Sequence, residues 1–473
     1  MLYIIKLLFL CCLLIPVSVS AHKRALYNII IDTDGGQDDF RAVTLFCASP
    51  DFNINAITST DGVLYPDETA GYFQLLLRGF GHEGIPVGVG EKNNCKKNFR
   101  EHALLGWERL FPEYTAPLLP KSLQIMYDAL ANESKTTIIV ALGPLTNISD
   151  ILKSHPELKP KIGLILWYNN DTELESGYNL ESDIEAFQYL NASHIPLKIV
   201  GSISGFNYSS GFFEDLDSLN NVYVAAFKKF NDAYGFENIE IWDDMCALYL
   251  GNINFFKETY NRSGLPAISP IEPFYGDILA GSMLNTNKTG QGVVFSEIPV
   301  SDFWIMQDIR DEVDKIVQIH GVQEFKIVAM ASEFHSHLGA YSIVGAKMGF
   351  RALEYFHAGL DEIQVISYAG DLPPVSCMND GLQYGTGATI GYGNILVDTT
   401  NVRPSAKVIY NKRAIEISLK PEICHQIEAD ISQLVKKYGL ESERYWAELR
   451  MISIRYWHDW DRRDMFDIKI LNE

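Results

Sequence analysis

The sequence contains little cysteine and comparatively few basic residues. It has seven cysteines in 473 residues, and two of them, Cys11 and Cys12, lie in an apolar N-terminal run. The other cysteines show no CxxC spacing, which argues against a zinc ribbon and against a disulfide scaffold. The 39 Lys and Arg against 60 Asp and Glu give a net charge of -21, which disfavours binding to a phosphate backbone. We therefore expect domains held by their hydrophobic cores, and no nucleic-acid partner.

Long apolar runs are also scarce, since the only one lies at the N-terminus. Lys6 precedes the apolar residues 7–17, and the small residues Val19-Ser20-Ala21 suit signal-peptidase cleavage before His22. The run is short for a bilayer span. Residues 1–21 therefore predict a signal peptide and an exported protein, periplasmic or secreted, with no stable membrane span. A membrane anchor and a lipid-modified cysteine are the alternatives.

The remaining chain predicts two domains. From Asn28 to about Val200, strand-like apolar runs alternate with helical periodicity, which is typical of βαβ units and a mostly parallel sheet. With 47% hydrophobic residues, the chain can fill more than one core. The expected strands are 27–31, 54–57, 85–88, 136–142, 162–167, 197–200 and 291–301, and the expected helices are 40–47, 70–78, 222–231, 244–250 and 308–320.

A second αβ-type pattern begins at Phe325–Met330 and continues to the end of the chain. No long flexible linker separates the two patterns, so we expect the domains to pack closely. The boundary is placed near Gly321. We therefore expect an α/β domain over residues 22–320, built on an open, mostly parallel sheet flanked by helices, and a smaller α+β domain over residues 321–473.

Carboxylates are concentrated in one short turn directly after the apolar strand 29–31. The segment reads Asp32-Thr33-Asp34-Gly35-Gly36-Gln37-Asp38-Asp39. Its negative charges repel one another unless a cation binds, and hard oxygen ligands suit Ca²⁺ or, less well, Mg²⁺. Open α/β sheets also bind their ligands outside the carboxyl ends of the strands. The segment therefore predicts a cation site, and a solvated acidic turn with an Asp helix cap is the alternative.

Four segments resemble signatures of the inosine-uridine nucleoside hydrolase family, in the family's order. Residues 32–39 are similar to its DTDPGxDD signature, and residues 141–148 to its GPLTNIA segment. Residues 178–186 resemble its EFNxxxDPEAA stretch, and Trp242-Asp243 its HD or WD pair. The resemblance implies a nucleoside hydrolase-like fold for the first domain and a small nucleoside-like substrate.

The same resemblance implies a calcium ion and a set of substrate contacts. The implied calcium ligands are the carboxylates of Asp34, Asp39 and Asp243 and the backbone carbonyl of Leu142. The implied general base is Asp34, and the implied substrate-binding residues are Asp38, Asn179 and Trp242, the last as a base-stacking or a core aromatic.

The implied reaction is hydrolysis of the N-glycosidic bond of a nucleoside or a related N-riboside. It passes through an oxocarbenium-like sugar and needs a nucleophile beside it, which a calcium-bound water next to a carboxylate base supplies. Three places depart from the family: its EFN glutamate falls on Gly177, the chain reads Ser59-Thr60-Asp61-Gly62 where the family often has a GN pair, and the proton-donating histidine of some members falls on Trp242. Two alternatives therefore stay open, a non-catalytic calcium-dependent nucleoside- or sugar-binding protein and a hydrolase of another glycosylamine.

The second domain resembles the FmdE family, named for a formylmethanofuran dehydrogenase subunit. Residues 334–338, 377–383 and 386–394 are similar to its FHGHLCPG, C-x-x-D-A-x-Q and TGCTxGxGN patterns, and two family cysteines are replaced by Gly339 and Ala388. The remaining His335, His337 and Cys377 suit a zinc site with an open position. A decayed metal site that leaves a ligand-binding or partner surface is the alternative, and homo-oligomerisation is left open.

Overall fold

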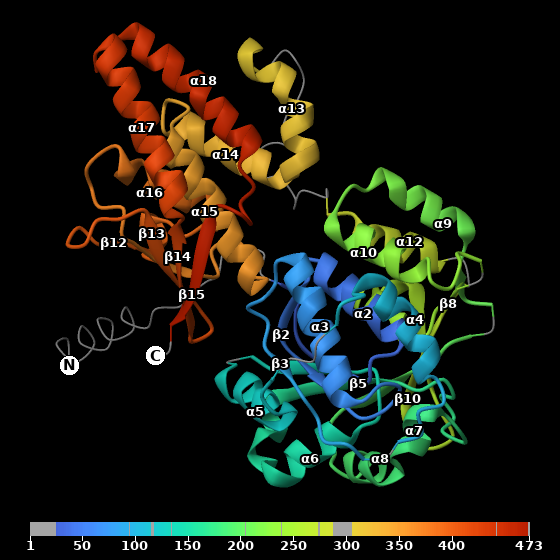
Figure 1. Cartoon of the computed structure of the whole chain (residues 1–473). Coiled ribbons are helices and arrows are strands. Elements are labelled where there is room, and N and C mark those ends of the chain that lie inside the picture. Colours follow the sequence, from blue (N-terminus) through green and yellow to red (C-terminus); the bar gives the residue numbers. More distant parts are fainter. Residues whose placement is uncertain are drawn as a thin grey trace, which may run out of the picture.

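The structure is a computed structural model that describes residues 25–471, except residues 94, 115–117, 134, 204, 238, 273–274, 287–304 and 441. Two bodies lie side by side, one built on each of two large sheets (Figure 1). The expected signal peptide, residues 1–21, and the expected strand 291–301 lie outside the described residues. Among the described residues, no helix combines the length and the apolar character needed to cross a membrane.

The first domain contains an eight-stranded sheet in the order β3-β2-β1-β4-β5-β6-β10-β9. All neighbouring strands are parallel except β10 and β9, which are antiparallel. The mostly parallel sheet predicted from the sequence is therefore confirmed. Its strands are β1 (Tyr27–Thr33), β2 (Phe52–Ser59), β3 (Val87–Gly88), β4 (Thr137–Ala141), β5 (Ile162–Tyr168), β6 (Leu197–Val200), β9 (Phe256–Tyr260) and β10 (Pro266–Pro270).

Helices cover both faces of this sheet. Ile29 and Ile31 of β1 join one core, whereas Ile30 points into the other, because successive side chains of a strand face opposite sides. The helices and the short strand pair of this domain are α2 (Gln37–Ala48), α3 (Pro66–Phe80), α4 (Arg100–Leu110), α5 (Ser122–Asn132), α6 (Thr146–Ser154), α7 (Tyr178–Ser182), α8 (Ile184–Asn191), β7 (Asn207–Tyr208), α9 (Ser210–Asp215), α10 (Val222–Asn231), β8 (Ile239–Glu240), α11 (Asp244–Gly251) and α12 (Tyr275–Leu284).

The second domain combines a mixed five-stranded sheet, in the order β12-β11-β13-β14-β15, with long helices, as its α+β prediction requires. Gly345 and Gly381 let α15 and α16 pack backbone against backbone, since a Cβ at either would overlap with a carbonyl oxygen of the other helix. Its elements are α13 (Gln307–His320), α14 (Val322–Phe334), α15 (Ala340–Phe356), β11 (Gln364–Ser367), α16 (Met378–Thr386), β12 (Ile395–Val397), β13 (Ser405–Tyr410), β14 (Arg413–Leu419), α17 (Pro421–Tyr438), α18 (Glu443–Asp459) and β15 (Phe466–Leu471).

Helix α13 packs on the second domain although it precedes the boundary expected near Gly321. Val313 and Ile316 of α13 share a hydrophobic cluster with Phe325 and Trp457. The segment Phe325–Met330, where the second sequence pattern begins, lies inside helix α14. The core of the second domain therefore begins with α13.

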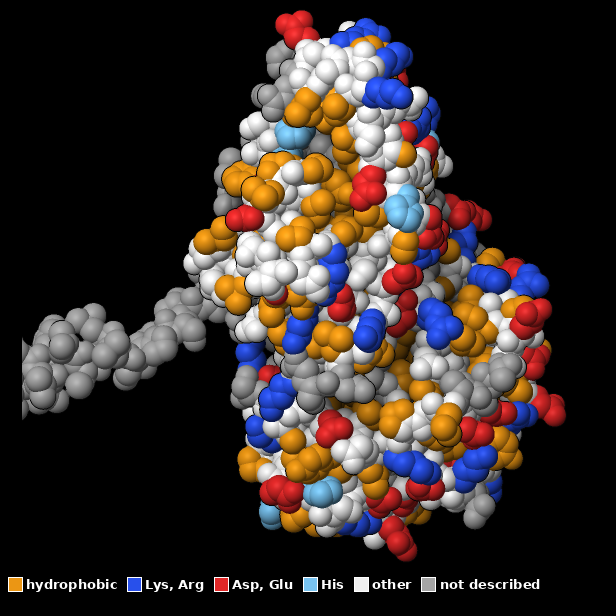
Figure 2. All heavy atoms as spheres, turned by 60° about the vertical axis from the view of Figure 1, so that its left-hand side comes forward, with side chains coloured by type: hydrophobic (Ala, Val, Ile, Leu, Met, Phe, Trp, Pro, Cys, Tyr) orange, Lys and Arg blue, Asp and Glu red, His pale blue; other side chains and the backbone are white. Residues whose placement is uncertain are grey.

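Exposed apolar side chains gather on one face of the second domain (Figure 2). The edge strand β12 and the turn before it contribute Ile390 at 75% and Leu396 at 63% exposure. Such patches are typical of interaction surfaces, so homo-oligomerisation stays a prediction.

Candidate active site

The acidic segment forms a tight turn between β1 and α2. Gly35 has a φ of 86°, and a Cβ there would lie 2.5 Å from the hydroxyl oxygen of Thr69. Trp107 donates a hydrogen bond from Nε1 to the carbonyl of Gly35 at 2.9 Å. The turn therefore requires glycine, and it places the first turn of α2 at the carboxyl end of the central strand.

The carboxylate of Asp39 is oriented by this turn. It accepts hydrogen bonds from the backbone N–H groups of Asp34, at 3.1 Å, and Gly36, at 3.0 Å. The hydroxyl of Thr33 also donates to it. These three donors hold the carboxylate of Asp39 in place without a bound ligand.

Asp243, just ahead of α11, meets the turn in space. Oxygens of Asp38, Asp39 and Asp243 lie within 4.8 Å of one another, and among the described residues this is the only group of three or more side chains that could hold a metal. The Oδ1 atom of Asp243 is buried and accepts no hydrogen bond from the described residues. The structure thus brings Asp243 to the turn, but the group within this distance contains Asp38, which the resemblance assigns to substrate, and not Asp34, which it assigns to calcium.

The cluster is unfavourable as a set of bare anions. Burial, and then the charges of Asp39 and Asp38, raise the pKa of Asp34 well above its usual value. Burial, and then Asp38, raise the pKa of Asp243, while burial and Asp39 raise the pKa of Asp38 to about 7. A bound cation reverses these effects because it stabilises every ionised carboxylate. The donor set is all oxygen and therefore fits calcium.

The carbonyl of Leu142 and the side chain of Asn179 lie together beside this cluster. The Nδ2 atom of Asn179 donates to the carbonyl of Leu142 at 3.0 Å and to that of Tyr168 at 3.1 Å. The Leu142 N–H donates to the carbonyl of Asp32 at 2.8 Å. Asn179 therefore orients the carbonyl that the sequence assigns to calcium, in addition to the substrate contact implied for it.

A second layer of polar residues, whose role the sequence pattern did not predict, supports the turn. Asp32 accepts hydrogen bonds from Thr58 at 2.6 Å and from Asn147 at 2.8 Å, and burial raises its pKa to about 7. Asn147 also donates to the carbonyl of Ser59 at 2.7 Å. These bonds tie together the ends of β1 and β2.

Arg41 links the two helices that carry the cluster. Its Nε and Nη2 atoms donate to the two carboxylate oxygens of Asp244 at 2.8 and 3.1 Å, and Nη2 also donates to the carbonyl of Glu240 at 2.9 Å. Both side chains of the ion pair are fully buried. Since Asp244 follows Asp243 and Arg41 lies two residues after Asp39, this pair sets the distance between the aspartates.

Two aromatic residues complete the surroundings. Trp242 is half-buried and packs against the larger core of the first domain, consistent with the core alternative for it. Tyr168, at the carboxyl end of β5, lies close enough to Asp243 and Asp38 for their charges to add to burial in raising its pKa. Its place at the end of a parallel strand is the signal that could have identified it.

A family model described as inosine-uridine preferring nucleoside hydrolase matches residues 29–277. The chain belongs to this family. A second family model matches residues 334–467, and its description reads FmdE, molybdenum formylmethanofuran dehydrogenase operon. The combination of a nucleoside hydrolase domain and an FmdE-like domain predicted from the sequence is therefore confirmed.

Curated relatives of this nucleoside hydrolase family member include pyrimidine-specific ribonucleoside hydrolases RihA. The protein of Escherichia coli O81 (strain ED1a) is 31% identical over 184 residues, 37% of this chain and 59% of the relative. That of Citrobacter koseri is 31% identical over 185 residues, with the same shares. The chain therefore spans about three fifths of the length of these relatives.

Solved structures similar to the chain include two nucleoside hydrolases. The plant nucleoside hydrolase PpNRh1 is 20% identical, with a TM-score of 0.46, over 55% of this chain and 99% of that chain. The purine-preferring ribonucleoside hydrolase from Gardnerella vaginalis is 17% identical, with a TM-score of 0.46, over 54% of this chain and 99% of that chain.

One departure from the nucleoside hydrolase pattern is explained by the backbone. Gly177, at the position of the family glutamate, has a φ of 131°, and a Cβ there would overlap with the side-chain amide of Asn169. Asn169 is buried and donates to the carbonyls of Asp171 at 2.7 Å and Ser176 at 3.0 Å. The side chain of Asn169 therefore fills the space that a side chain at position 177 would need, and this position requires glycine.

The second departure, in the segment 59–62, is an acidic residue that binds a loop. Asp61 accepts hydrogen bonds from the N–H groups of Asn93 at 2.8 Å and Cys95 at 3.1 Å. It also pairs with Lys97 at 2.5 Å, and Lys97 donates to the carbonyls of Gly62 and Leu64. Asp61 therefore holds Asn93, Cys95 and Lys97 against the turn that contacts Asp34.

We expect Gly177→Glu to destabilise the protein rather than to restore the family contact. The positive φ and the overlap with Asn169 together cost about 1–3 kcal/mol. Urea unfolding of the variant measures this loss, with Gly205→Glu as the control, since Gly205 also has a positive φ but has no atom within 4 Å of a Cβ position. Equal losses in the two variants would show that crowding by Asn169 is unimportant.

The second-domain histidines meet at a turn after α14. His335 Nδ1 lies 2.7 Å from an oxygen of Asp380, and the rings of His335 and His337 have centroids 4.2 Å apart. The Nε2 atom of His335 is buried and has no hydrogen-bond partner among the described residues. Cys377 is half-buried just ahead of α16, and its sulfur does not form a group with both imidazoles within 4.8 Å. Asp380, which the sequence analysis did not single out, orients His335.

Proposed function

We propose that the protein is a calcium-dependent hydrolase that releases base and sugar from a nucleoside or a related N-riboside. The main support is the buried meeting of Asp39 and Asp243, from opposite ends of the first domain's sequence, beside Asp34 and Asp38. The names of the curated relatives, ribonucleoside hydrolases, support the same reaction class.

The residues present have distinct roles in this reaction. Asp34, Asp39, Asp243 and the Leu142 carbonyl would hold the ion, which supplies positive charge that favours deprotonation of water. Asp34 accepts the proton from the attacking water. Asp38 accepts a hydrogen bond from a ribose hydroxyl, and Asn179 keeps the Leu142 carbonyl in place.

Few side chains of this protein can protonate the base as it leaves the sugar. Trp242 can stack on the base, but an indole N–H does not deliver a proton. General-acid catalysis is typically worth a factor of about 10² to 10⁴, so we propose a preference for bases that leave easily. A non-catalytic calcium-dependent binding protein is the second candidate, favoured by Gly177 and Trp242, and hydrolysis of another glycosylamine is the third.

An assay of the purified full chain against a panel of nucleosides tests the proposal. We expect base release in calcium to fall by about 10²-fold or more with chelator and to return when calcium is added back. Release that chelator does not change would overturn the calcium assignment. Calcium-dependent nucleoside binding without release would instead identify the binding protein.

For the second domain, we propose that His335 and His337 bind zinc; Cys377, whose sulfur does not lie within 4.8 Å of both imidazoles, would have to move closer to serve as the third ligand. The unpartnered Nε2 of His335 supports this, since Asp380 on Nδ1 leaves that nitrogen for a metal. Metal analysis of His335→Ala and Cys377→Ala separates the possibilities: unchanged zinc in both variants removes the site. Export after cleavage of residues 1–21 is likewise proposed, and N-terminal sequencing of the mature protein tests it.

A further inference from the structure

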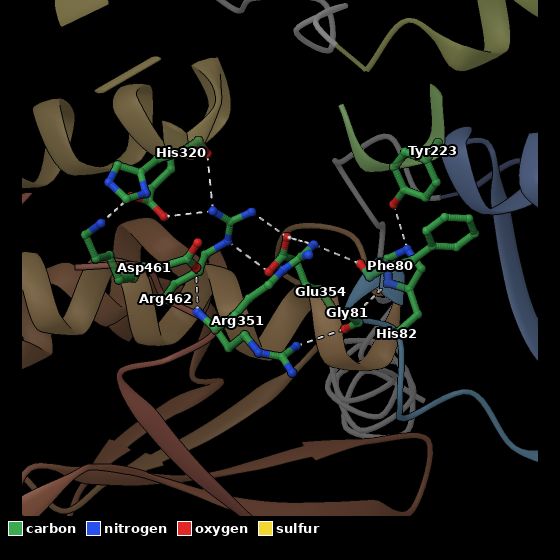
Figure 3. Close-up of polar contacts among 12 residues, drawn as sticks. Phe80, Gly81, His82, Tyr223, His320, Arg351, Glu354, Asp461 and Arg462 are labelled. Carbon is green, nitrogen blue, oxygen red and sulfur yellow. Dashed lines mark hydrogen bonds and ion pairs between the residues drawn. The ribbon is translucent and has the colours of Figure 1, made fainter. Parts of the chain in front are cut away.

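Helix α3 connects the candidate active site to the second domain. At its start, the backbone N–H of Leu64 and the hydroxyl of Thr69 donate to the carbonyl of Asp34 at 2.9 and 3.1 Å. The helix has 15 residues and therefore spans about 22 Å. Its far end, Phe80-Gly81, lies at the domain junction (Figure 3). The position of α3 therefore bears directly on Asp34.

The second domain closes the carboxyl end of this helix. Arg463 donates to the carbonyls of Gly79 at 3.3 Å and Phe80 at 3.1 Å, and Arg351 donates to the carbonyl of Gly81 at 2.9 Å. The last carbonyls of a helix have no partner within it, and cations are favourable there because of the helix dipole. We call Arg351 and Arg463 the arginine clamp.

The chain that follows α3 is also held by the second domain. The Nη2 atom of Arg351 donates to both carboxylate oxygens of Glu83, at 2.9 and 3.0 Å, while its Nη1 donates to Gly81. His82 Nδ1 lies 2.7 Å from the carbonyl of Glu354, and the N–H of Gly84 donates to the carbonyl of Tyr355 at 2.8 Å. The end of α3 is therefore fixed by side chains and backbone of α15 together.

Buried charges hold the clamp in place. Glu354 accepts two hydrogen bonds from Arg462, at 2.9 and 2.6 Å, and lies 3.6 Å from Arg463 (Figure 3). Arg462 also pairs with Glu324 at 3.0 Å, and Glu324 pairs with the buried Lys347 at 2.5 Å. These pairs order Arg462 and Glu354 next to the clamp; Arg463 contacts this network through Glu354, whereas Arg351 is paired across the junction with Glu83.

We propose that Arg351 and Arg463 are positioning residues for the Asp34 site, acting through α3. By closing the end of this helix, the FmdE-like domain fixes the helix whose first turn holds the carbonyl of Asp34. The second domain thus completes the hydrolase fold, whatever its own histidine site binds. The consequence for calcium and turnover rests on the proposed function, whereas the consequence for the order of α3 does not.

Hydrogen–deuterium exchange of the full chain tests the coupling without reference to activity. In Arg351→Met/Arg463→Met, we expect the amides along α3, and those of Leu64 and Tyr65 just ahead of it, to exchange about tenfold faster. Arg403→Met is the matched control, because Arg403 makes two hydrogen bonds to Glu416 within the second domain. Faster exchange confined to residues 79–84 would overturn the proposal.

Calcium titration of the same variants supplies the second measurement. We expect the clamp variant Arg351→Met/Arg463→Met to need about tenfold more calcium for half-saturation. Arg351→Lys/Arg463→Lys should recover part of this affinity, because lysine keeps the positive charge but lacks the several N–H donors of a guanidinium group. Wild-type calcium affinity in the clamp variant would overturn the coupling. A wild-type protein that binds no calcium would instead contradict the proposed function, and the exchange measurement still decides the proposal.

Discussion

Asp34→Asn is expected to lower the rate of base release by about 10³-fold or more, since both the general base and a calcium ligand are lost. Asparagine keeps the shape of the side chain, so the packing of Gly62 and Gly143 against residue 34 is preserved. Steady-state release of free base in saturating calcium measures the effect. Asp311→Asn, an exposed carboxylate on α13, is the control and is expected to leave the rate unchanged.

The same substitution is expected to stabilise the calcium-free protein. Because burial and neighbouring charges raise the pKa of Asp34 and Asp38, the native state takes up protons that the unfolded chain does not. The free energy of unfolding of the calcium-free wild type should therefore rise as the pH falls from about 7 to about 4. Urea unfolding of Asp34→Asn should show a smaller rise. Greater stability of the wild type without calcium would contradict the picture of mutually repelling carboxylates.

Arg41→Met is expected to cost about 3–5 kcal/mol of unfolding free energy, because it leaves the buried carboxylate of Asp244 without its partner. Both groups are fully buried, and only uncharged donors would remain for Asp244: the hydroxyl of Tyr208 at 3.1 Å and the backbone N–H of Trp242 at 3.3 Å. Urea unfolding measures the loss. The matched control is Arg109→Met, whose exposed pair with Asp232 should be worth about 0–1 kcal/mol.

A double variant separates the charge from the packing. Arg41→Met/Asp244→Leu replaces the ion pair by apolar side chains and should recover much of the stability, as such replacements are often neutral. Calcium affinity should stay low in both variants, because Arg41 links the helix of Asp39 to that of Asp243. If Arg41→Met loses no more stability than Arg109→Met, the buried pair does not hold α2 and α11 together.

Local sequence patterns predicted the acidic cluster and strands β1 to β6 of the sheet, but not β9 and β10. The predicted strands are apolar runs, and Asp34, Asp38 and Asp39 stand directly after the first of them, where open α/β sheets bind ligands. Asp243 required the family resemblance, since nothing in its own surroundings distinguishes it. The fold class of the first domain could therefore be predicted from the alternation of apolar strands and helices, and its site from the resemblance to the family's sequence motifs.

The remaining features depend on contacts between distant parts of the chain. Arg41 and Asp244 are separated by 203 residues, and either alone looks like an ordinary surface charge in the sequence. Gly177 was visible as a missing glutamate, but its positive φ and the side chain of Asn169 beside it were not. Of the three ligands expected in the second domain, His335 and His337 lie together at a turn, with their rings in contact. Cys377 lies at the start of another helix, α16.

The arginine clamp has a consequence for the order in which the protein is made. Arg351 follows Gly81 by 270 residues, so at about 5–20 residues per second the ribosome exposes the end of α3 well before its donors exist. The carboxyl end of α3 therefore has no partner for its last carbonyls until the second domain has been made. In a first domain produced without the second, the amides of α3 should exchange faster than in the full chain, and a second domain added as a separate chain should slow that exchange if it binds.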